Sequence, residues 1–353
     1  MNIISTPVMP HNPRPIILIG AGGIVNDAHL PAYKIAGFPV MGIYDIDHAK
    51  AQRTAQQFGI PKVFDSIGQL SAHLPSDALI DLAVPGAAIA GVLAQLPNRT
   101  AVLMQKPMGN DYNEAQTILD TCRQKQLLAA VNFQLRYTPF INAARNILQQ
   151  GLIGELVDIE INVNVYMPWH LWPFVFGLPR VEILYHSIHY IDLVRSFFGN
   201  PAGVYAKTVK HPIMEELASV RSDIIMDYGD RLRASIHTAH CHRFGLRHQQ
   251  SYIWLEGTRG AIKITMGVLK DYPRGVPDEF EYISYVNSPD AEWQRLELAG
   301  SWFPHAFIGS MAQLQRAAEG SIAAPDNSVE DSIHTMACVE AAYRSSEKGG
   351  EKI

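Results

Sequence analysis

The feature that most constrains the fold is a short apolar segment followed at once by a glycine-rich turn. Residues 15–20 read PIILIG and predict a buried strand, and the turn leads into a helix that reaches about residue 36. Further apolar runs alternate with helical segments, and such crossovers join parallel strands. The strands are expected at 15–20, 40–44, 63–64, 78–84, 101–105 and 127–133. We therefore expect an α/β domain over residues 1–133, with a doubly wound parallel sheet.

The pattern changes after about residue 134. A helix is expected over 138–150, and residues 156–167 alternate apolar and polar side chains as a strand with one covered face does. After a helix over 182–198, strands joined by Gly and Pro turns follow, and the last 45 residues return to helix. This predicts a second α+β domain over 134–353 with a large, open, mostly antiparallel sheet. Whether its last helices pack on the first domain stays open.

Composition excludes several classes of protein. The chain is 47% hydrophobic and 18% charged, as in an ordinary globular protein, and its net charge of −5 gives no basic surface for nucleic acid or an anionic membrane. Its three cysteines, Cys122, Cys241 and Cys338, are scattered, which argues against a disulfide framework or a thiolate zinc site. The first residues lack the pattern of a secretory signal, and no apolar stretch is long enough to span a bilayer. We expect a cytoplasmic protein.

The glycine turn has the context of a dinucleotide-binding motif, because IGAGGIV lies between a strand and a helix. Gly20 permits the tight turn, and Gly22 lets the backbone approach a pyrophosphate. Gly23 and Ile24 begin the helix, whose free N–H groups and positive dipole end favour phosphate. Val25 occupies the position of the third glycine, so the match is incomplete.

Asp45 ends the second expected strand, where a carboxylate can accept hydrogen bonds from an adenosine ribose. The same carboxylate would repel a 2′-phosphate, and no arginine adjoins it, so NAD is favoured over NADP. A tight turn with an unrelated aspartate at a strand end is the alternative.

The sequence EILYHSIHYID at 182–192 places His186, His189 and Asp192 within an otherwise apolar helical pattern. Three interpretations compete. With Glu182 at helical spacing, the histidines could bind a metal in a zinc-assisted enzyme. They could be hydrogen-bonded core groups. They could also act as an acid and a base beside a nicotinamide ring, since imidazole has suitable basicity near pH 7. We favour the third interpretation, expect no metal, and expect Asp192 to support helix packing or to pair with Arg195.

Several motifs in order resemble one family. The segment MQKPMG (104–109) joins GAGGIV, VNFQLRYTP (131–139), HYID, LEGTRGAIKIT (255–265) and the terminal VEDSIHTMACVEAAYRSS. Together they resemble the glucose–fructose oxidoreductase / inositol dehydrogenase / rhizopine catabolism (Gfo/Idh/MocA) family over nearly the whole chain. The resemblance implies a Rossmann domain followed by a domain with an open antiparallel sheet. Members of the family mostly oxidise or reduce one hydroxyl-bearing carbon of a sugar or cyclitol with NAD(P).

The resemblance also implies roles for single residues. The family's Glu-Lys-Pro motif corresponds to Gln105, Lys106 and Pro107, with glutamine in place of glutamate. We assign Lys106 to stabilise a developing alkoxide and His189 to accept the hydroxyl proton. The family's aspartate four residues before that histidine is Tyr185 here, so Tyr185 and His186 are expected to assist.

Further positions follow from the same comparison. Val84 and Pro85, after the fourth expected strand, join Gln105 and Lys106 in binding the cofactor, but the histidine often found shortly after this proline is missing. The aromatic segment 166–182 offers candidate substrate contacts, with coverage of a core or of an oligomer contact as the alternative. The substrate candidates are Trp169, His170, Trp172, Arg136 and Arg180. Arg136 matches the family's segment after the sixth expected strand, whereas Arg180 could equally be a solvated loop charge.

These observations predict an NAD(P)-dependent oxidoreductase acting on a sugar, sugar derivative or cyclitol. Lys106 and His189 are expected to converge on one alcohol oxygen beside the nicotinamide. Two alternatives remain: a redox-cycling glycosidase or lyase that keeps NAD bound, and a non-catalytic sensor of dinucleotide and sugar. Because an open sheet with a bare apolar face is unfavourable in water, we also expect a homodimer or homotetramer.

Overall fold

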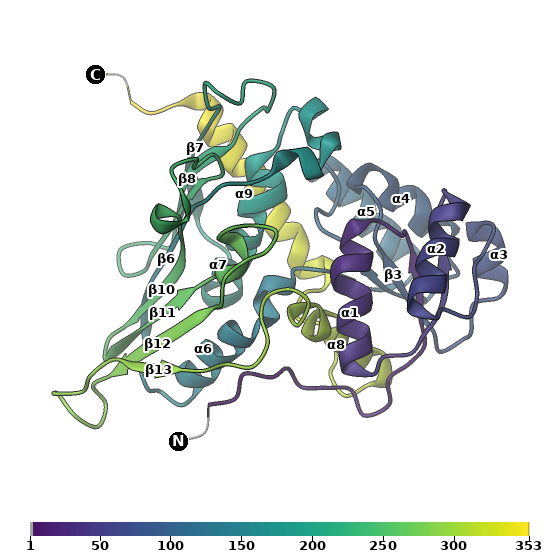
Figure 1. Cartoon of the computed structure of the whole chain (residues 1–353), viewed down its shortest axis with the longest axis horizontal. Helices are drawn as coiled ribbons and strands as arrows, with labels where there is room; N and C mark the ends of the chain where they lie inside the picture. Colours follow the sequence, from purple (N-terminus) through teal and green to yellow (C-terminus); the bar gives the residue numbers. More distant parts are fainter. Residues whose placement is uncertain (1–2, 352) are drawn as a thin grey trace. The chain divides into compact units, whose positions relative to one another are not determined.

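The computed structural model describes residues 3–351 and 353 and divides into two compact units (Figure 1). The parallel-sheet unit contains Pro7–Tyr137 and Phe303–Met336. The antiparallel-sheet unit contains the chain up to Thr6, Thr138–Trp302 and Ala337–Ile353. The chain therefore enters each unit more than once.

The parallel-sheet unit is built on five parallel strands in the order β2-β1-β3-β4-β5. Their bounds are β1 (Ile16–Ile19), β2 (Val40–Tyr44), β3 (Leu79–Leu82), β4 (Ala101–Met104) and β5 (Leu128–Val131). The doubly wound sheet is confirmed. Residues 63–64 were expected to form a further strand, but they make only an isolated bridge between Val63 and Ile43, with Phe64 donating its N–H to the Ile43 carbonyl.

Helices flank this sheet, and their ends have the residues that capping requires. Asp47 and Asp111 each accept a backbone N–H at a helix start, while Gly37 and Gly59 end helices in the left-handed conformation. The helices include a π turn, η1 (Val25–His29), and α1 (Leu30–Ala36), α2 (His48–Phe58), α3 (Ile67–Ala72), α4 (Gly86–Gln95), α5 (Tyr112–Gln124) and α8 (Ala306–Glu319). Helix α8 contacts β4, β5 and the 3₁₀ turn η2 (Gln134–Tyr137), and its Phe307 and Met311 complete the core. A late segment of the chain thus forms part of the first sheet's core.

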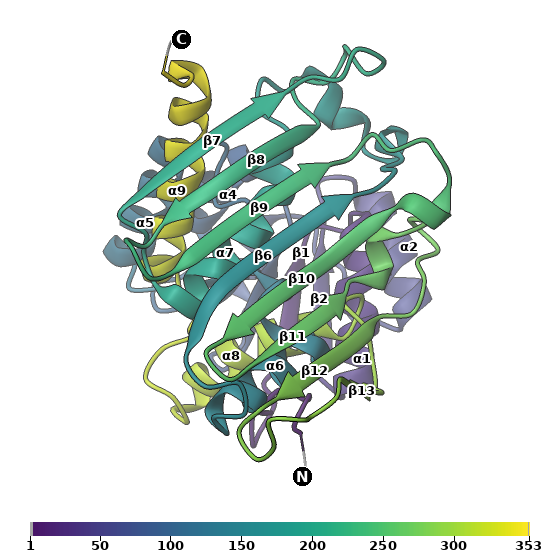
Figure 2. The same ribbon diagram turned by 90° about the vertical axis from the view of Figure 1, so that its left-hand side faces the viewer.

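The antiparallel-sheet unit holds eight strands in the order β13-β12-β11-β10-β6-β9-β8-β7 (Figure 2). They are β6 (Leu156–Asn164), β7 (Gly203–Val209), β8 (Arg221–Asp227), β9 (Arg233–Ala239), β10 (Gln250–Gly257), β11 (Gly260–Thr265), β12 (Glu279–Ser284) and β13 (Gln294–Leu296). Only the β6–β9 pair among them is parallel. The mostly antiparallel sheet is therefore confirmed, although the sequence reading did not identify β7, β8 or β13.

The two faces of this sheet differ. In β6, Ile159, Ile161 and Val163 are fully buried, while the residues between them are partly exposed. Helices α6 (Pro139–Gln149), α7 (Ile188–Phe198) and α9 (Val329–Lys348) lie on the covered side (Figure 1). The residues between the buried ones point to the open face, because successive side chains of a strand point to opposite faces of the sheet.

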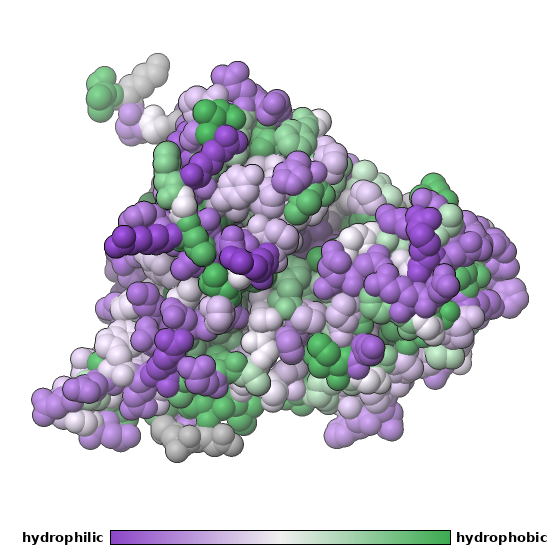
Figure 3. All heavy atoms as spheres, in the orientation of Figure 1, coloured by the Kyte–Doolittle hydropathy of each residue, from purple (hydrophilic) through white to green (hydrophobic). Residues whose placement is uncertain are grey.

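The molecular surface mixes residue types. In the view of Figure 3, hydrophilic and hydrophobic residues are interspersed, which agrees with the balance of apolar and charged residues in the sequence. Within the described part of the chain, no helix combines the length and apolarity that a bilayer crossing requires.

Candidate active site

The glycine turn after β1 is shaped by close packing on one side and open space on the other. Gly20 has a φ of +109°, and a Cβ added there would lie 2.2 Å from the Ala83 carbonyl oxygen, so only glycine fits. An added Cβ on Gly22 would meet no atom within 4 Å. The Asn26 side chain donates to the Ala21 and Gly22 carbonyls at 3.1 and 2.9 Å and keeps the turn in place. The exposed side of Gly22 is where a phosphate could approach the backbone.

Gly23 and Ile24 form the start of the helix that follows, so their backbone N–H groups precede any intrahelical acceptor. The first full turn is the π turn η1, in which the Leu30 N–H donates to the Val25 carbonyl five residues earlier. These groups and the helix dipole can bind an anion. The turn therefore has the geometry that the sequence predicted for a dinucleotide phosphate.

Asp45 lies directly after β2 and is held rigidly by the backbone. Its Oδ2 accepts the Ala21 N–H at 2.7 Å and its Oδ1 accepts the Asp47 N–H at 2.8 Å. Each carboxylate oxygen retains a lone pair for a further donor. Asp45 thus joins the glycine turn to the end of β2, the position from which it can accept ribose hydroxyls.

Residues after β3 and β4 complete this edge of the parallel sheet. Val84 is partly buried, and Pro85 precedes α4 as its N-cap residue. The Gln105 N–H donates to the Leu82 carbonyl at 2.8 Å, which fixes the chain just before Lys106. Burial lowers the pKa of Lys106 to about 8. Because the carboxyl ends of parallel strands share one edge, Lys106 lies at the same edge of this sheet as the glycine turn.

Behind this edge lies a set of buried polar groups that sequence reasoning missed. Asp81 and His29 are fully buried, and their side chains approach to 2.7 Å. Asn132 approaches both His29 and Gln105. The available signal was an aspartate in the middle of the apolar run LIDL, where a buried strand has no need of a charge.

In the antiparallel-sheet unit, the helix expected over 182–198 begins with a π turn, η5 (Ile183–Ser187), before α7. The Ile188 N–H donates to the Ile183 carbonyl, five residues earlier. A π turn changes the angular spacing of side chains, so the uniform helical stripe expected for Glu182, His186 and His189 is corrected here. Such turns recur at functional sites.

Glu182 faces the sheet and is fully buried. Its Oε1 accepts the Ser187 hydroxyl at 2.7 Å and its Oε2 accepts the Ser222 hydroxyl from β8. Burial raises the pKa of this carboxyl, and the hydroxyl donors counter only part of that rise. Both oxygens are thus engaged in the core. Within the described residues no group of three His, Cys, Asp or Glu side chains could hold a metal ion.

His186 and His240 form an aromatic cluster with Trp169. The ring centroids of His186 and His240 lie 4.4 Å apart, and those of His186 and Trp169 lie 4.8 Å apart. Burial lowers the pKa of His240 to about 3, so this imidazole is neutral. Its Nδ1 lies 3.7 Å from Glu182 Oε1. The structure therefore brings His186 and Trp169 together and adds His240 to the cluster.

His189 and Tyr185 occupy separate surroundings on the same helix. His189 is 8% exposed and meets the Trp302 ring edge-on, with centroids 5.7 Å apart. Tyr185 is partly buried beside Phe174, with ring centroids 5.7 Å apart. His189 thus combines an almost buried imidazole with an aromatic neighbour.

The substrate candidates are placed differently from one another. Trp169 is buried and donates its Nε1–H to the His240 carbonyl at 3.3 Å, Trp172 packs on Tyr272, and His170 is exposed. The Arg180 guanidinium pairs with Glu340 at 2.7 Å.

Arg136 belongs to the parallel-sheet unit and is 4% exposed. It donates to Asp331 at 2.6 Å and to the Asp326 carbonyl at 2.7 Å. Both arginines are therefore held by internal acceptors, which sequence alone did not reveal.

Comparisons with known proteins identify the family. Residues 15–133 match the oxidoreductase family with an NAD-binding Rossmann fold, Gfo/Idh/MocA. Residues 141–263 match the Gfo/Idh/MocA C-terminal domain. The chain belongs to this family of NAD-binding oxidoreductases. The residues of the glycine turn, Asp45 and the β4 end fit the dinucleotide, because Gly22 leaves open space beside the helix start.

Three relatives illustrate the likeness. The D-apiose dehydrogenase of Rhizobium rhizogenes is 24% identical over 345 residues, which cover 94% of this chain and 95% of that protein. An oxidoreductase from Agrobacterium radiobacter, solved with NAD⁺, L-tartaric acid and magnesium, is 19% identical with a TM-score of 0.77 and covers 96% of this chain and 98% of its own. A putative myo-inositol dehydrogenase from Sinorhizobium meliloti is 20% identical with a TM-score of 0.74. The match covers 95% of this chain and 98% of that protein. The two solved structures support the fold.

Proposed function

We propose that this protein is a dehydrogenase that transfers hydride between NAD(P) and a hydroxyl-bearing carbon of a sugar, sugar derivative or cyclitol. The family assignment supports the oxidoreductase class, and the apiose dehydrogenase relative supports a carbohydrate substrate. The observation that carries the proposal is Lys106, whose pKa is lowered to about 8 at the edge of the sheet that bears the glycine turn. A lysine at this edge can stabilise a substrate oxygen that gains negative charge during the reaction.

We assign cofactor binding to the parallel-sheet unit. Gly20, Gly22, Gly23 and Ile24 would hold the pyrophosphate through backbone N–H groups, and Asp45 would accept the adenosine ribose hydroxyls. The remaining contacts would come from the ends of the next strands: Val84, Pro85, Gln105 and Lys106. The Asp45 carboxylate opposes a 2′-phosphate, so the proposed cofactor is NAD in preference to NADP.

The chemistry follows from the residue types. NAD(P), when bound by the residues above, would supply the hydride chemistry. In the oxidation direction His189 accepts the hydroxyl proton of the substrate, since imidazole titrates near neutral pH. The Lys106 ammonium would stabilise negative charge that develops on a reacting oxygen. Tyr185 and His186 orient the imidazole or hydrogen-bond the substrate.

We assign substrate contacts to the aromatic segment that precedes this helix. His170 is exposed, while Trp169 packs on His186 and so can transmit its position to the ring. Trp172 contributes an aromatic surface for ring C–H groups. Arg136 and Arg180 remain candidates for polar substrate groups, and their internal pairing with Asp331 and Glu340 would orient the guanidinium groups.

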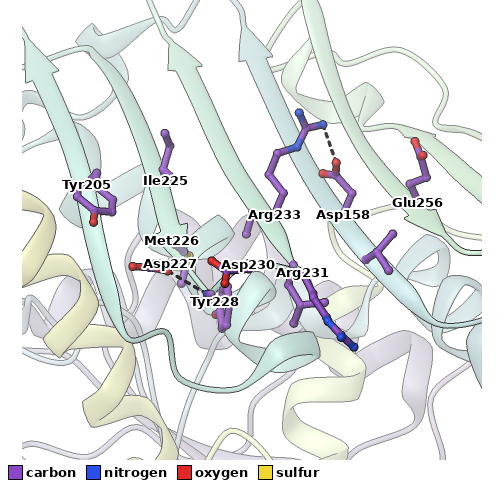
Figure 4. A pocket seen from close by; sticks show the side chains of 14 residues that line it. Asp158, Tyr205, Ile225, Met226, Asp227, Tyr228, Asp230, Arg231, Arg233 and Glu256 are labelled. Carbon is purple, nitrogen blue, oxygen red and sulfur yellow. Dashed lines mark hydrogen bonds and ion pairs between the residues drawn. The ribbon is translucent and has the colours of Figure 1, made fainter.

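We further propose that residues 1–133 bind the cofactor and that residues 134–353 bind the substrate and form the oligomer contact, although α8 within the second range returns to the core of the parallel-sheet unit. The open sheet face supports a homodimer or homotetramer, because apolar Tyr205 and Ile225 are 62% and 53% exposed there. They line a hollow of about 750 Å³ beside Asp158, Arg233 and Glu256 (Figure 4). Cross-strand pairing brings Tyr205 opposite Ile225 and Asp158 opposite Arg233. Light scattering after gel filtration tests this proposal, and a monomer at micromolar concentration would contradict it.

A cytoplasmic location is the matching proposal for the cell. All three cysteines are free and buried, and burial raises the pKa of the Cys122 thiol to about 12. Unpaired buried thiols are typical of proteins in a reducing compartment.

The function is tested with a panel of sugars and polyols read by NADH absorbance, with NAD and NADP in parallel. We expect NADH formation with at least one carbohydrate and a preference for NAD. A bound cofactor with substrate conversion but no net NADH would favour the redox-cycling glycosidase or lyase. Dinucleotide binding without turnover of any compound would favour the sensor.

A further inference from the structure

A chain of buried polar side chains begins at Asp81, in the middle of β3. His29, the last residue of η1, places its Nδ1 2.7 Å from Asp81 Oδ2. The Tyr33 hydroxyl donates to the same oxygen at 2.8 Å. All three residues are fully buried. Because a carboxylate only accepts hydrogen bonds, His29 Nδ1 donates at this contact, and in the neutral tautomer with this proton Nε2 is an acceptor.

Asn132, one residue past β5, extends this chain to Gln105. Its Nδ2 lies 3.4 Å from His29 Nε2 and 3.0 Å from Gln105 Oε1. An amide nitrogen carries two hydrogens, so Asn132 can donate to both acceptors at once. The opposite orientation of the Asn132 amide would place its oxygen against two acceptors. The donor direction of each hydrogen bond is thus set from Asp81 outward.

The buried chain has a cost that packing alone does not explain. Asp81 Oδ1 and Asn132 Oδ1 are buried without a hydrogen-bond partner among the described residues. Such groups destabilise a fold. The neighbours of Asp81 in β3, Leu79, Ile80 and Leu82, show that apolar side chains fit the same strand. The buried polar groups of this hydrogen-bonded series are explained if the series positions its last member, Gln105.

We propose that Asn132 is a positioning residue for the cofactor: with the His29–Asp81 pair, it turns the Gln105 carbonyl inward so that the glutamine amide N–H groups face the dinucleotide. The inference rests on the proposed function in placing residue 105 against the nicotinamide nucleoside. The outward amide would donate to an oxygen acceptor there, a ribose hydroxyl or the carboxamide oxygen. A glutamate at 105, the residue usual in the family, would present an acceptor, so this chain has the opposite polarity.

The test is a double-mutant cycle on NADH binding, followed by NADH fluorescence without substrate. We expect Asn132→Leu and Gln105→Ala each to weaken NADH binding about tenfold, as the loss of an aligned hydrogen bond does. The double variant should bind NADH no more than about twofold more weakly than Gln105→Ala alone, because Asn132 acts through Gln105. Losses that multiply to about a hundredfold would overturn the inference.

Asn327→Leu is the matched control for damage to the fold. Asn327 is also fully buried, and its Nδ2 donates to the Val131 carbonyl at 2.8 Å and to Ser310 at 3.2 Å, without contact to Gln105. We expect a lower melting temperature with NADH affinity unchanged within about twofold. An equal loss of NADH affinity in this control would contradict a specific role for Asn132.

Asn132→Asp keeps the size of the side chain but donates no proton when ionised, and it serves if Asn132→Leu does not fold. We expect it also to weaken NADH binding while Gln105 is present, and to have little effect in the Gln105→Ala background. If the unmodified protein binds neither NAD nor NADH, the proposed function fails. If it binds NADH and the Asn132 variants bind equally well, only this inference fails.

Discussion

Each unit buries a carboxylate beside a π turn: Asp81 of β3 lies beside η1, and Glu182 directly precedes η5. The hydrogen-bond donors to these two carboxylates differ. Asp81 meets an imidazole and a phenol, and its hydrogen bonds continue through Asn132 to the sheet edge. Glu182 meets the Ser187 and Ser222 hydroxyls, and these bonds stay within the core. The hydrogen-bonded series from Asp81 can orient Gln105 at the edge of the sheet. The Glu182 hydrogen bonds hold the start of its own helix against β8.

The comparison also separates two ways of building a site. In the parallel-sheet unit, the proposed cofactor contacts come mostly from backbone N–H groups and strand ends, which the fold itself positions. In the antiparallel-sheet unit, the active-site candidates are side chains whose placement depends on packing against Trp169, His240 and Trp302. Substitutions at the glycine turn or Asp45 should therefore affect cofactor binding, whereas substitutions at His189 or at Lys106 should affect turnover.

The largest expected effect is the loss of His189 in the antiparallel-sheet unit. We expect His189→Ala to lower kcat by about 10²–10⁴-fold, since this is the usual contribution of a general base. NADH affinity should stay close to that of the unmodified protein, because the cofactor contacts lie in the other unit. His237→Ala is the matched control: His237 is exposed on the open face and pairs with Asp223 at 2.6 Å. Normal turnover in His189→Ala would break the assignment.

The second largest effect on turnover is expected for Lys106, and its titration should also make activity depend on pH. We expect Lys106→Met to lower kcat by about 10²–10³-fold, the cost of removing one preorganised charge from a reacting oxygen. In the direction of carbonyl reduction, activity of the unmodified protein should fall as pH rises through about 8, because the ammonium is lost there. Initial rates across pH 6–10 measure this limb. Its persistence in Lys106→Met would assign it to another group.

The same substitution should raise stability. The pKa of Lys106 is lowered from 10.5 to about 8, so below pH 8 its folded ammonium lacks hydration that the unfolded chain regains. Lys106→Met removes this cost, and we expect a gain of about 1–3 kcal/mol at pH 7. The gain should shrink between pH 8 and 10.5, where the folded lysine is neutral and the unfolded one still binds a proton. Denaturant unfolding measures it, and a less stable variant at pH 7 would contradict the sign.

A smaller effect is expected for cofactor choice at Asp45. Asp45→Ser removes the charge that opposes a 2′-phosphate, and we expect the ratio of NAD to NADP affinity to fall about tenfold, or about 1.4 kcal/mol. Asp47→Ser is the control: Asp47 caps α2 by accepting the Lys50 N–H at 3.1 Å, so its loss should lower stability and leave the ratio unchanged. An unchanged ratio in Asp45→Ser would show that another group selects the cofactor.

The smallest effect is expected at Glu182. Burial raises the pKa of Glu182 above 4.5, so the folded state keeps its proton after the unfolded chain has released it. Stability from this group is therefore present at acid pH and falls as pH rises above 4.5. Glu182→Gln, which does not titrate, should gain stability relative to the unmodified protein over this range. Thermal melts at several pH values measure the difference, and a difference that does not change with pH would contradict a raised pKa.

The sequence by itself determined the alternation of strands and helices in the parallel-sheet unit, apart from residues 63–64, and the positions of the glycine turn, Asp45 and the lysine after β4. These features depend on local rules: apolar runs, turn residues and the offset between a strand end and its helix. Gly20 is the clearest example, since its neighbours in sequence predict the turn and the Ala83 contact then requires glycine. The family resemblance, carried by motifs in order, was confirmed by the two domain matches.

Only the tertiary structure decided which polar groups meet. His29, Asp81, Asn132 and Gln105 are far apart in sequence, and their alignment depends on the order β1-β3-β4-β5. The uniform helical stripe failed at η5, because a π turn arises from local packing that hydrophobic spacing does not encode. The partners of two arginines were also not predictable, because Arg136 and Arg180 donate to carboxylates more than a hundred positions later in the sequence. Local patterns specify elements, whereas hydrogen-bond partners depend on how distant elements pack.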